Sequence, residues 1–185
     1  IYNQECKAGR IVAREPLMPV AMPGIGLDFD SISPSVLDSL IIGAFSQNAL
    51  GLRLRRLLRT FANALSATSD ESKILTIIFA LDGILTNESS TSKQFKKFIG
   101  VSASPSLDKC QGQYKQFCDF YNDVRNPLVH HGKSYSDLGR NRKTDLLYLQ
   151  SLVAGLLTSM APDANEEFDD HWHRKMIIAN SRLSF

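Results

Sequence analysis

Residues 121–132 read YNDVRNPLVHHG, and they stand where one helical pattern ends and another begins. Upstream of them, apolar residues recur at every third or fourth position, which is typical of one face of a helix. This stripe consists of Leu107, Cys110, Tyr114, Cys118 and Tyr121. Arg125 continues the stripe in register, so we predict that it lies on the inward face of the helix's last turn. An unpaired guanidinium would be costly there, so Arg125 needs a partner.

The proline that follows Arg125 two residues later predicts a change of direction. Pro127 disfavours the α conformation at Asn126, so we expect the helix to stop at Asn126. Asn126 would then cap a new helical turn whose first residue is Pro127. His130 would lie one turn into this new segment, and Gly132 offers a place to end it. Such a break can bring Arg125, Asn126 and one histidine together around a small anion.

The same residues resemble the signature of the HEPN domains, and most closely that of their Apea-like branch. The signature is an arginine, usually a polar residue next, and a histidine a few positions later. Here it reads Arg125-Asn126-Pro127-Leu128-Val129-His130, followed by the His131-Gly132 typical of that branch. A looser resemblance covers a basic amphipathic stretch at 52–58, an apolar segment at 77–85 and a closing leucine-rich helix. Together these stretches fall within residues 35–160.

The resemblance implies metal-independent cleavage of RNA. In this chemistry the imidazole of His130 accepts the ribose 2′-hydroxyl proton or protonates the leaving oxygen. The Arg125 guanidinium stabilises the phosphorane as charge builds on its oxygens. Asn126 helps to orient the site, and His131 is the alternative to His130. In the family two copies of the motif usually meet across a dimer, so we expect a homodimer with a composite site.

The resemblance also implies a biological setting. The expected partner is an RNA substrate, and the expected location is the cytoplasm. The family suggests an effector of an antiviral defence or growth-arrest system, switched on by an upstream regulatory domain. The rival function is a non-catalytic HEPN module that binds RNA or a protein partner. A third possibility is a purely structural helical bundle.

Spacing alone leaves other roles open for the same residues. Arg125 can form a helix-terminal salt bridge while His130 bonds a backbone carbonyl, because structural networks often imitate functional ones. Asp82 is either buried opposite the motif, as a partner for Arg125 or a histidine, or exposed to solvent. Tyr121, one turn before Arg125, is expected in the core rather than as a platform for base stacking.

The composition is that of a soluble globular protein, with 43% hydrophobic and 22% charged residues. A formal charge of +2 is too small to indicate a nucleic-acid-binding protein, so any affinity for RNA must come from local clustering. Three cysteines without paired spacing fit a reducing compartment. No stretch approaches the roughly 20 apolar residues that span a bilayer, and we expect no membrane partner.

The sequence predicts neither a metal site nor a cofactor. No cysteine has a histidine or a second cysteine at zinc or nucleophile spacing, and no glycine-rich phosphate loop occurs. His171 and His173, beside Asp169 and Asp170, look like a metal-ligand cluster. However, residues two apart on a helix point in divergent directions, which argues against one shared ion.

We predict an all-α fold, a bundle of about five to seven helices. Cap-proline pairs open two of them, at Ser33-Pro34 and Ser104-Pro105. The capping pattern Thr68-Ser69-Asp70-Glu71 opens another, from 73 to 86. That helix is apolar nearly all round, so we expect it to be central, with Asp82 as its one interior charge.

Residues 1–32 differ from the rest of the chain. Prolines at positions 16, 19 and 23 exclude a continuous helix, and residues 9–15 suit a short strand. We therefore predict an extended arm, or the remnant of an upstream domain, over 1–32 and a HEPN-like helical domain over 33–185. Because the chain begins with Ile1, we expect it to be a fragment of a longer protein.

Overall fold

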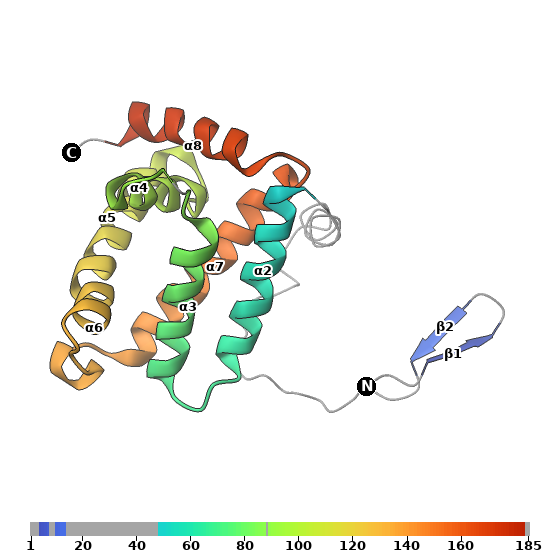
Figure 1. Ribbon diagram of the computed structural model, residues 1–185, viewed down its shortest axis with the longest axis horizontal. Helices are drawn as coiled ribbons and strands as arrows, with labels where there is room; N and C mark the ends of the chain where they lie inside the picture. The colour runs from blue at the N-terminus through green and yellow to red at the C-terminus, as the bar shows by residue number, and fades with distance from the viewer. Residues whose placement is uncertain (1–3, 8–9, 14–47, 88, 184–185) are drawn as a thin grey trace.

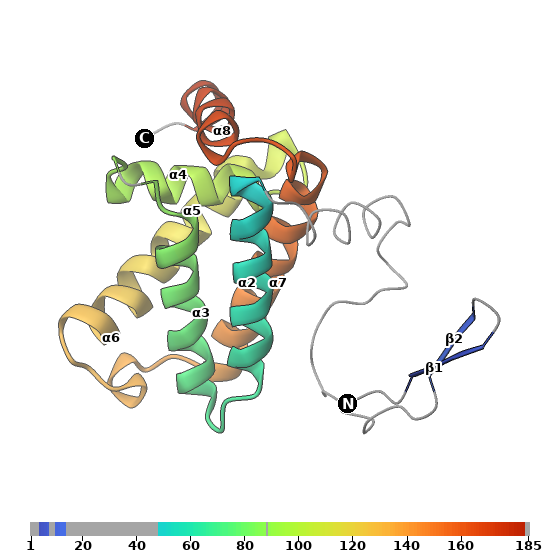
Figure 2. The same cartoon turned by 45° about the vertical axis from the view of Figure 1, so that its right-hand side comes forward.

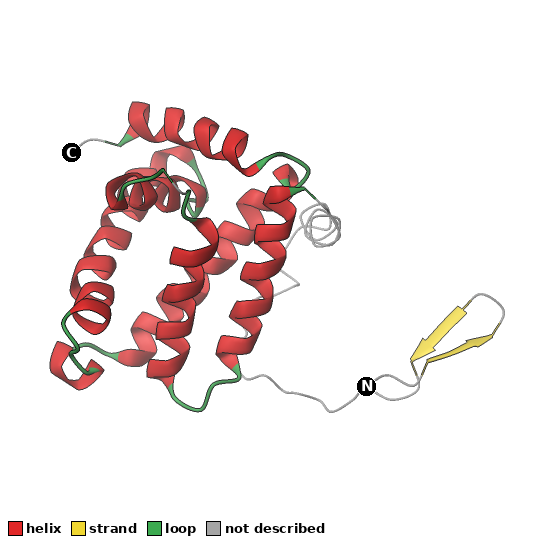
Figure 3. Cartoon of the chain, viewed as in Figure 1, coloured by secondary structure: helices red, strands yellow, loops and turns green. Residues whose placement is uncertain are grey.

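The computed structural model describes residues 4–7, 10–13, 48–87 and 89–183. Over 48–183 the chain is a bundle of helices, and the predicted all-α class with about five to seven helices is confirmed (Figure 3). The α-helices are α2 (Ala49–Leu65), α3 (Asp70–Leu85), α4 (Ser92–Ser102), α5 (Cys110–Phe120), α6 (Asn126–His130), α7 (Arg142–Met160) and α8 (Phe168–Arg182).

A short antiparallel pair of strands precedes the bundle. β1 (Gln4–Lys7) pairs with β2 (Arg10–Ala13), with Gln4 opposite Ala13. β2 falls within the strand predicted over 9–15, whereas β1 was not predicted. The rest of the predicted arm, and the helix expected to begin at Ser33-Pro34, lie outside the described residues.

Helices α2 and α3 form an antiparallel pair, and α7 packs along both of them (Figures 1 and 2). The core side of α7 is buried almost completely, as its three- and four-residue spacing requires. It contributes Leu149, Leu152, Val153, Leu156, Leu157 and Met160. α4 packs against α5 and α8, and together α4 and α8 cover one end of the α2–α3–α7 group (Figure 2).

Side-chain caps explain where several helices begin. Ser69 accepts a hydrogen bond from the amide of Ser72 and caps α3. The helix therefore starts within the predicted capping stretch 68–71 and earlier than residue 73, but through Ser69 alone and not through a capping box of Thr68 and Glu71. α3 is less enclosed than predicted, because the Phe79 side chain is 53% exposed. Ser104-Pro105 does not open α5: a 3₁₀ turn, Leu107–Lys109, comes first, and α5 begins at Cys110.

Two glycines let helices approach closely. A Cβ atom on Gly100 of α4 would lie 2.7 Å from the Cα atom of Tyr114 on α5. A Cβ atom on Gly155 of α7 would lie 2.8 Å from the carbonyl oxygen of Ala103, at the end of α4. These contacts fix α4 against its neighbours, and α4 in turn supplies part of the site described next.

Candidate functional site

The helix that carries the motif does not stop at Asn126. α5 continues through a π-helical turn, η3 (Tyr121–Arg125), directly into α6. Asn126 has helical angles, with φ −64° and ψ −45°, and its amide donates to the carbonyl of Tyr121, five residues back. The prediction that Asn126 caps a new helix is therefore wrong. In a regular α-helix the ring of Pro127 would collide with the carbonyl four residues earlier, and the wider π turn gives the ring room.

The helix ends where the glycine was predicted to end it. Gly132 has φ +61°, in the left-handed region that glycine enters without a steric cost. The amide of Lys133 then donates to the carbonyl of Pro127 at 3.2 Å. His130 and His131 are thus the last residues before the chain turns, and both are exposed.

Asp82 of α3 is the partner of Arg125. The Nε and Nη2 groups of Arg125 donate to Oδ2 of Asp82 at 3.0 and 2.6 Å. The two side chains are only 14% and 20% exposed, so Arg125 lies on the inward side of its helix, as its register predicts. Of the alternatives left open for Asp82, the structure therefore has the ion pair with Arg125.

Tyr121 completes this side of the site. Its ring is buried in the core, as predicted, and lies 4.7 Å from Cζ of Arg125. Its hydroxyl donates to Oδ1 of Asp82 at 3.4 Å. Burial raises the pKa of the Tyr121 hydroxyl, and the Asp82 carboxylate raises this pKa further, so the phenol stays a neutral donor.

The opposite side of the guanidinium faces Asn126 and His130. Nη1 of Arg125 donates to Oδ1 of Asn126 at 3.2 Å and contacts Nε2 of His130. A guanidinium cannot accept a hydrogen bond, so Nε2 of His130 must be the acceptor. Within the described part of the chain, Arg125 contacts His130 and not His131.

Most of the guanidinium's donors are already engaged. An arginine side chain has five N–H groups, and the four hydrogen bonds to Asp82, Asn126 and His130 use four of them. One N–H on Nη2 remains. An anion that takes two bonds from Arg125 must therefore displace Asn126 or His130 from Nη1.

Lys96 of α4 also reaches the motif. Its Nζ atom donates to Oδ1 of Asn122 at 3.0 Å and lies 4.6 Å from the centre of the Tyr121 ring. The sequence did not single out this lysine, because its position beside the motif depends on how α4 packs against α5. No spacing along the chain encodes that contact.

A second ionic cluster lies beyond the motif, and the sequence did not indicate it either. Asp145, in the first turn of α7, is 3% exposed and accepts two hydrogen bonds from Arg140, at 2.9 and 2.7 Å. The hydroxyl of Tyr135 also donates to Asp145. Burial alone would raise the pKa of Asp145, but these hydrogen bonds outweigh it and hold the pKa low. The cluster ties the 3₁₀ turn Tyr135–Leu138 to α7.

The histidines of α8 diverge, as their spacing predicts. His171 is fully buried, whereas His173 is exposed and contacts the carbonyl of Asp169. His171 lies near two carboxylates, Asp163 and Glu166, in a group with metal-ligand chemistry. The guanidinium of Arg174 donates to both carboxylates at 2.8 Å, so a side-chain cation already occupies this cluster.

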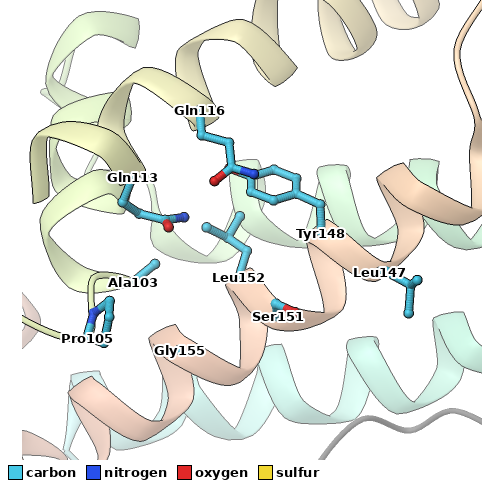
Figure 4. Close-up of a pocket in the computed structure, with 9 residues that line it drawn as sticks. All are labelled: Ala103, Pro105, Gln113, Gln116, Leu147, Tyr148, Ser151, Leu152 and Gly155. Atoms are coloured by element: carbon cyan, nitrogen blue, oxygen red, sulfur yellow. The ribbon is translucent and has the colours of Figure 1, made fainter. Parts of the chain in front are cut away.

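One cavity among the described residues lies away from the motif. A hollow of about 480 Å³ lies between α5 and α7 (Figure 4). Gln113 and Gln116 of α5 face Tyr148 and Leu152 of α7 across it (Figure 4). None of the predicted site residues lines this hollow.

No family model, curated protein or solved structure matches this chain. None of the described helices has both the length and the apolar character needed to cross a bilayer. The HEPN resemblance therefore rests on the residues quoted above.

Proposed function

We propose that the chain is a metal-independent endoribonuclease of the HEPN type, with Arg125 and His130 as its catalytic residues. The observation that carries this proposal is the contact between Nη1 of Arg125 and Nε2 of the exposed His130. Asp82 holds the guanidinium from the other side, so the fork is oriented before any substrate arrives. Asn126 supports the same orientation.

The chemistry follows from which groups the substrate displaces. A phosphodiester that binds Nη1 of Arg125 takes the place of His130 and frees its Nε2 atom. The free imidazole nitrogen accepts the proton of the ribose 2′-hydroxyl. The 2′-oxygen attacks the adjacent phosphorus, the bond to the 5′-oxygen breaks, and that oxygen takes up a proton. The products are a 2′,3′-cyclic phosphate and a 5′-hydroxyl, and Arg125 stabilises the charge of the phosphorane between them.

A second copy of the chain would complete the site. In-line displacement needs a base on one side of the phosphorus and an acid on the other. One motif brings a single histidine to Arg125. A homodimer whose two motifs face each other supplies the second histidine. From the resemblance we extend the proposal to a cytoplasmic effector of a defence or growth-arrest system, controlled by an upstream regulatory domain.

The engagement of Arg125 favours one rival. Because four of its five N–H groups are bonded within the chain, the guanidinium also suits a purely supporting role. The rival function is a non-catalytic HEPN module that binds RNA or a protein partner through the same helical surface.

The decisive experiment compares His130→Ala with His131→Ala in cleavage of single-stranded RNA with excess EDTA. Both histidines are exposed, so neither change should unfold the chain. We expect His130→Ala to lose roughly 10²- to 10⁴-fold in rate and His131→Ala to stay near the wild-type rate. The wild-type products should carry 2′,3′-cyclic phosphate ends. Equal rates for the two variants, or an inert wild type, would overturn the nuclease proposal.

Arg125 is better tested by a conservative change than by truncation. Arg125→Ala would leave the carboxylate of Asp82 unpaired and mostly buried, so lost activity would be confused with lost stability. Arg125→Lys keeps the positive charge but removes the fork-shaped donor. We expect it to stay folded by circular dichroism and to lose roughly 10²-fold or more in cleavage rate.

A further inference from the structure

The positive charge of Arg125 is already balanced within the motif, so it cannot by itself offset the charge of a bound phosphate. The carboxylate of Asp82 lies 2.6 Å from the guanidinium of Arg125, so these two charges cancel. The ion pair of Asp82 and Arg125 therefore has no net charge before RNA binds. Each phosphate adds a negative charge, and RNA affinity at this site needs a further cation.

Lys96 is placed to supply that cation. Its ammonium group and Cζ of Arg125 lie 4.6 and 4.7 Å from the centre of the same Tyr121 ring. The two cations are therefore separated by no more than the sum of these distances, so one nucleotide can bridge them. The contacts of Lys96 are a neutral amide oxygen, on Asn122, and the face of the ring. No carboxylate among the described residues pairs with Lys96.

These contacts orient the ammonium without neutralising it. An ammonium has three N–H donors, and one of them goes to Asn122. Two remain for a ligand. The Tyr121 ring supports the positive charge through its π face. The side chain is half-buried, so less rotamer freedom is lost when it binds than for a freely moving lysine.

We propose that Lys96, oriented by Asn122 and the Tyr121 ring, forms a second phosphate-binding site for the RNA backbone beside the Arg125–His130 pair. This inference rests on the proposed function in that it takes RNA as the ligand. Lys96 binds a phosphate next to the one that reacts, so it is a positioning residue and not a catalytic one.

The test measures how RNA binding depends on salt. The His130→Ala chain, which should not cleave, is titrated with a fluorescent single-stranded RNA by anisotropy over a series of NaCl concentrations. A plot of the logarithm of the RNA association constant against the logarithm of the salt concentration has a negative slope. For single strands the magnitude of this slope decreases by about 0.7 for each phosphate contact that is lost. We expect Lys96→Met in this background to weaken binding and to flatten the slope by about that amount. Lys96→Arg should restore both.

Lys109→Met is the matched control, because it removes the same charge from an exposed lysine. Lys109 directly precedes α5, at the end of this helix that lies away from Tyr121. Lys109 stands twelve residues before Tyr121, about 18 Å along the helix axis, which exceeds the screening length of about 8 Å at physiological salt. Lys109→Met should therefore leave the salt slope near that of the His130→Ala parent chain.

The outcomes separate the two proposals. If Lys96→Met keeps the parent slope, the second phosphate site is wrong, whether or not the wild type cleaves. If RNA binds with the predicted loss of slope but the wild type never cleaves, the phosphate site stands and the nuclease proposal fails. If the parent chain does not bind RNA even at low salt, both proposals fail.

Discussion

Among single residues, His171 is one whose protonation the fold opposes. It is fully buried, and its Nδ1 atom lies 3.2 Å from Oδ2 of Asp163. Its Nε2 atom has no hydrogen-bond partner among the described residues. Burial, and then the charge of Lys175, lower the pKa of His171 to about 4, although Asp163 acts in the opposite direction. The imidazole is therefore neutral at pH 7.

This lowered pKa predicts how stability depends on pH. In the unfolded chain a histidine titrates near pH 6.5. Between pH 6.5 and about 4, His171 is therefore mostly protonated in the unfolded state and mostly neutral in the folded state. Stability from this group is complete above pH 6.5 and is lost as the pH falls. We expect the free energy of unfolding to drop by about 2 kcal/mol from pH 7 to pH 5. Urea titrations at the two pH values measure it.

The control for this prediction uses the other histidine of α8. His171→Phe cannot take up a proton, so it should lose much of this pH dependence. His173→Phe should keep it, because His173 is exposed. If both variants lose as much stability as the wild type between pH 7 and pH 5, His171 is not responsible.

The motif shows which single-residue contacts a sequence can predict. The three- and four-residue spacing was enough to place Tyr121 in the core and Arg125 on the inward face. It could not decide whether Asp82 pairs with Arg125, because these residues belong to different helices, α3 and η3. Lys96 was missed for the same reason, since it reaches the motif only through the packing of α4 on α5.

At the scale of whole helices, two glycines predict opposite outcomes for the same substitution. Gly83 lies inside α3, and a Cβ atom there would meet nothing within 4 Å. Gly83→Ala should therefore stabilise the protein by roughly 0.5–1 kcal/mol through helix propensity alone. Gly100→Ala would push α4 away from the backbone of Tyr114 and should destabilise by roughly 1–3 kcal/mol. Thermal melts of both variants would contradict this if the two melting temperatures shift in the same direction.

Helix boundaries followed local chemistry where a side chain could satisfy the first amides. Ser69, within the predicted capping stretch 68–71, caps α3, and Asn141 caps α7 by accepting from the amides of residues 143 and 144. The predictions failed at Pro105, which precedes α5, and at Pro127, in the helical continuation of α5. Pro105 is followed by a 3₁₀ turn, and Pro127 lies inside a continuous helix. Proline limits the backbone locally, but whether a helix stops or widens depends on what its side chains bury on either side.

For the whole molecule, the proposed composite site predicts how mixed dimers behave. If wild-type and His130→Ala chains are mixed equally and exchange freely, about a quarter of the dimers have two wild-type chains. A site that needs both histidines should then retain about a quarter of the wild-type activity. Sites that act independently should retain about half. Sedimentation at the assay concentration, to establish that dimers form, is the accompanying measurement.

The fold class was predictable because helical periodicity persists through most of 48–183. The packing order of the helices was not. The sequence marked α3 as the central helix, yet Phe79 of α3 is 53% exposed, while α7 buries its whole inner side. Period and polarity identify which side of a helix faces inward. Which helix lies deepest depends on contacts between residues far apart in the chain.

The π turn before Pro127 also constrains how many residues the helix can have between α5 and Pro127. A π turn holds one residue more than the α turn it replaces, and deleting a residue from Tyr121–Arg125 would restore regular winding. That deletion would bring the ring of Pro127 against the carbonyl four residues earlier and would turn the segment after it by about 100°. The extra residue and the proline are therefore interdependent. A lineage that lost the one without the other would lose the alignment of Arg125 with His130.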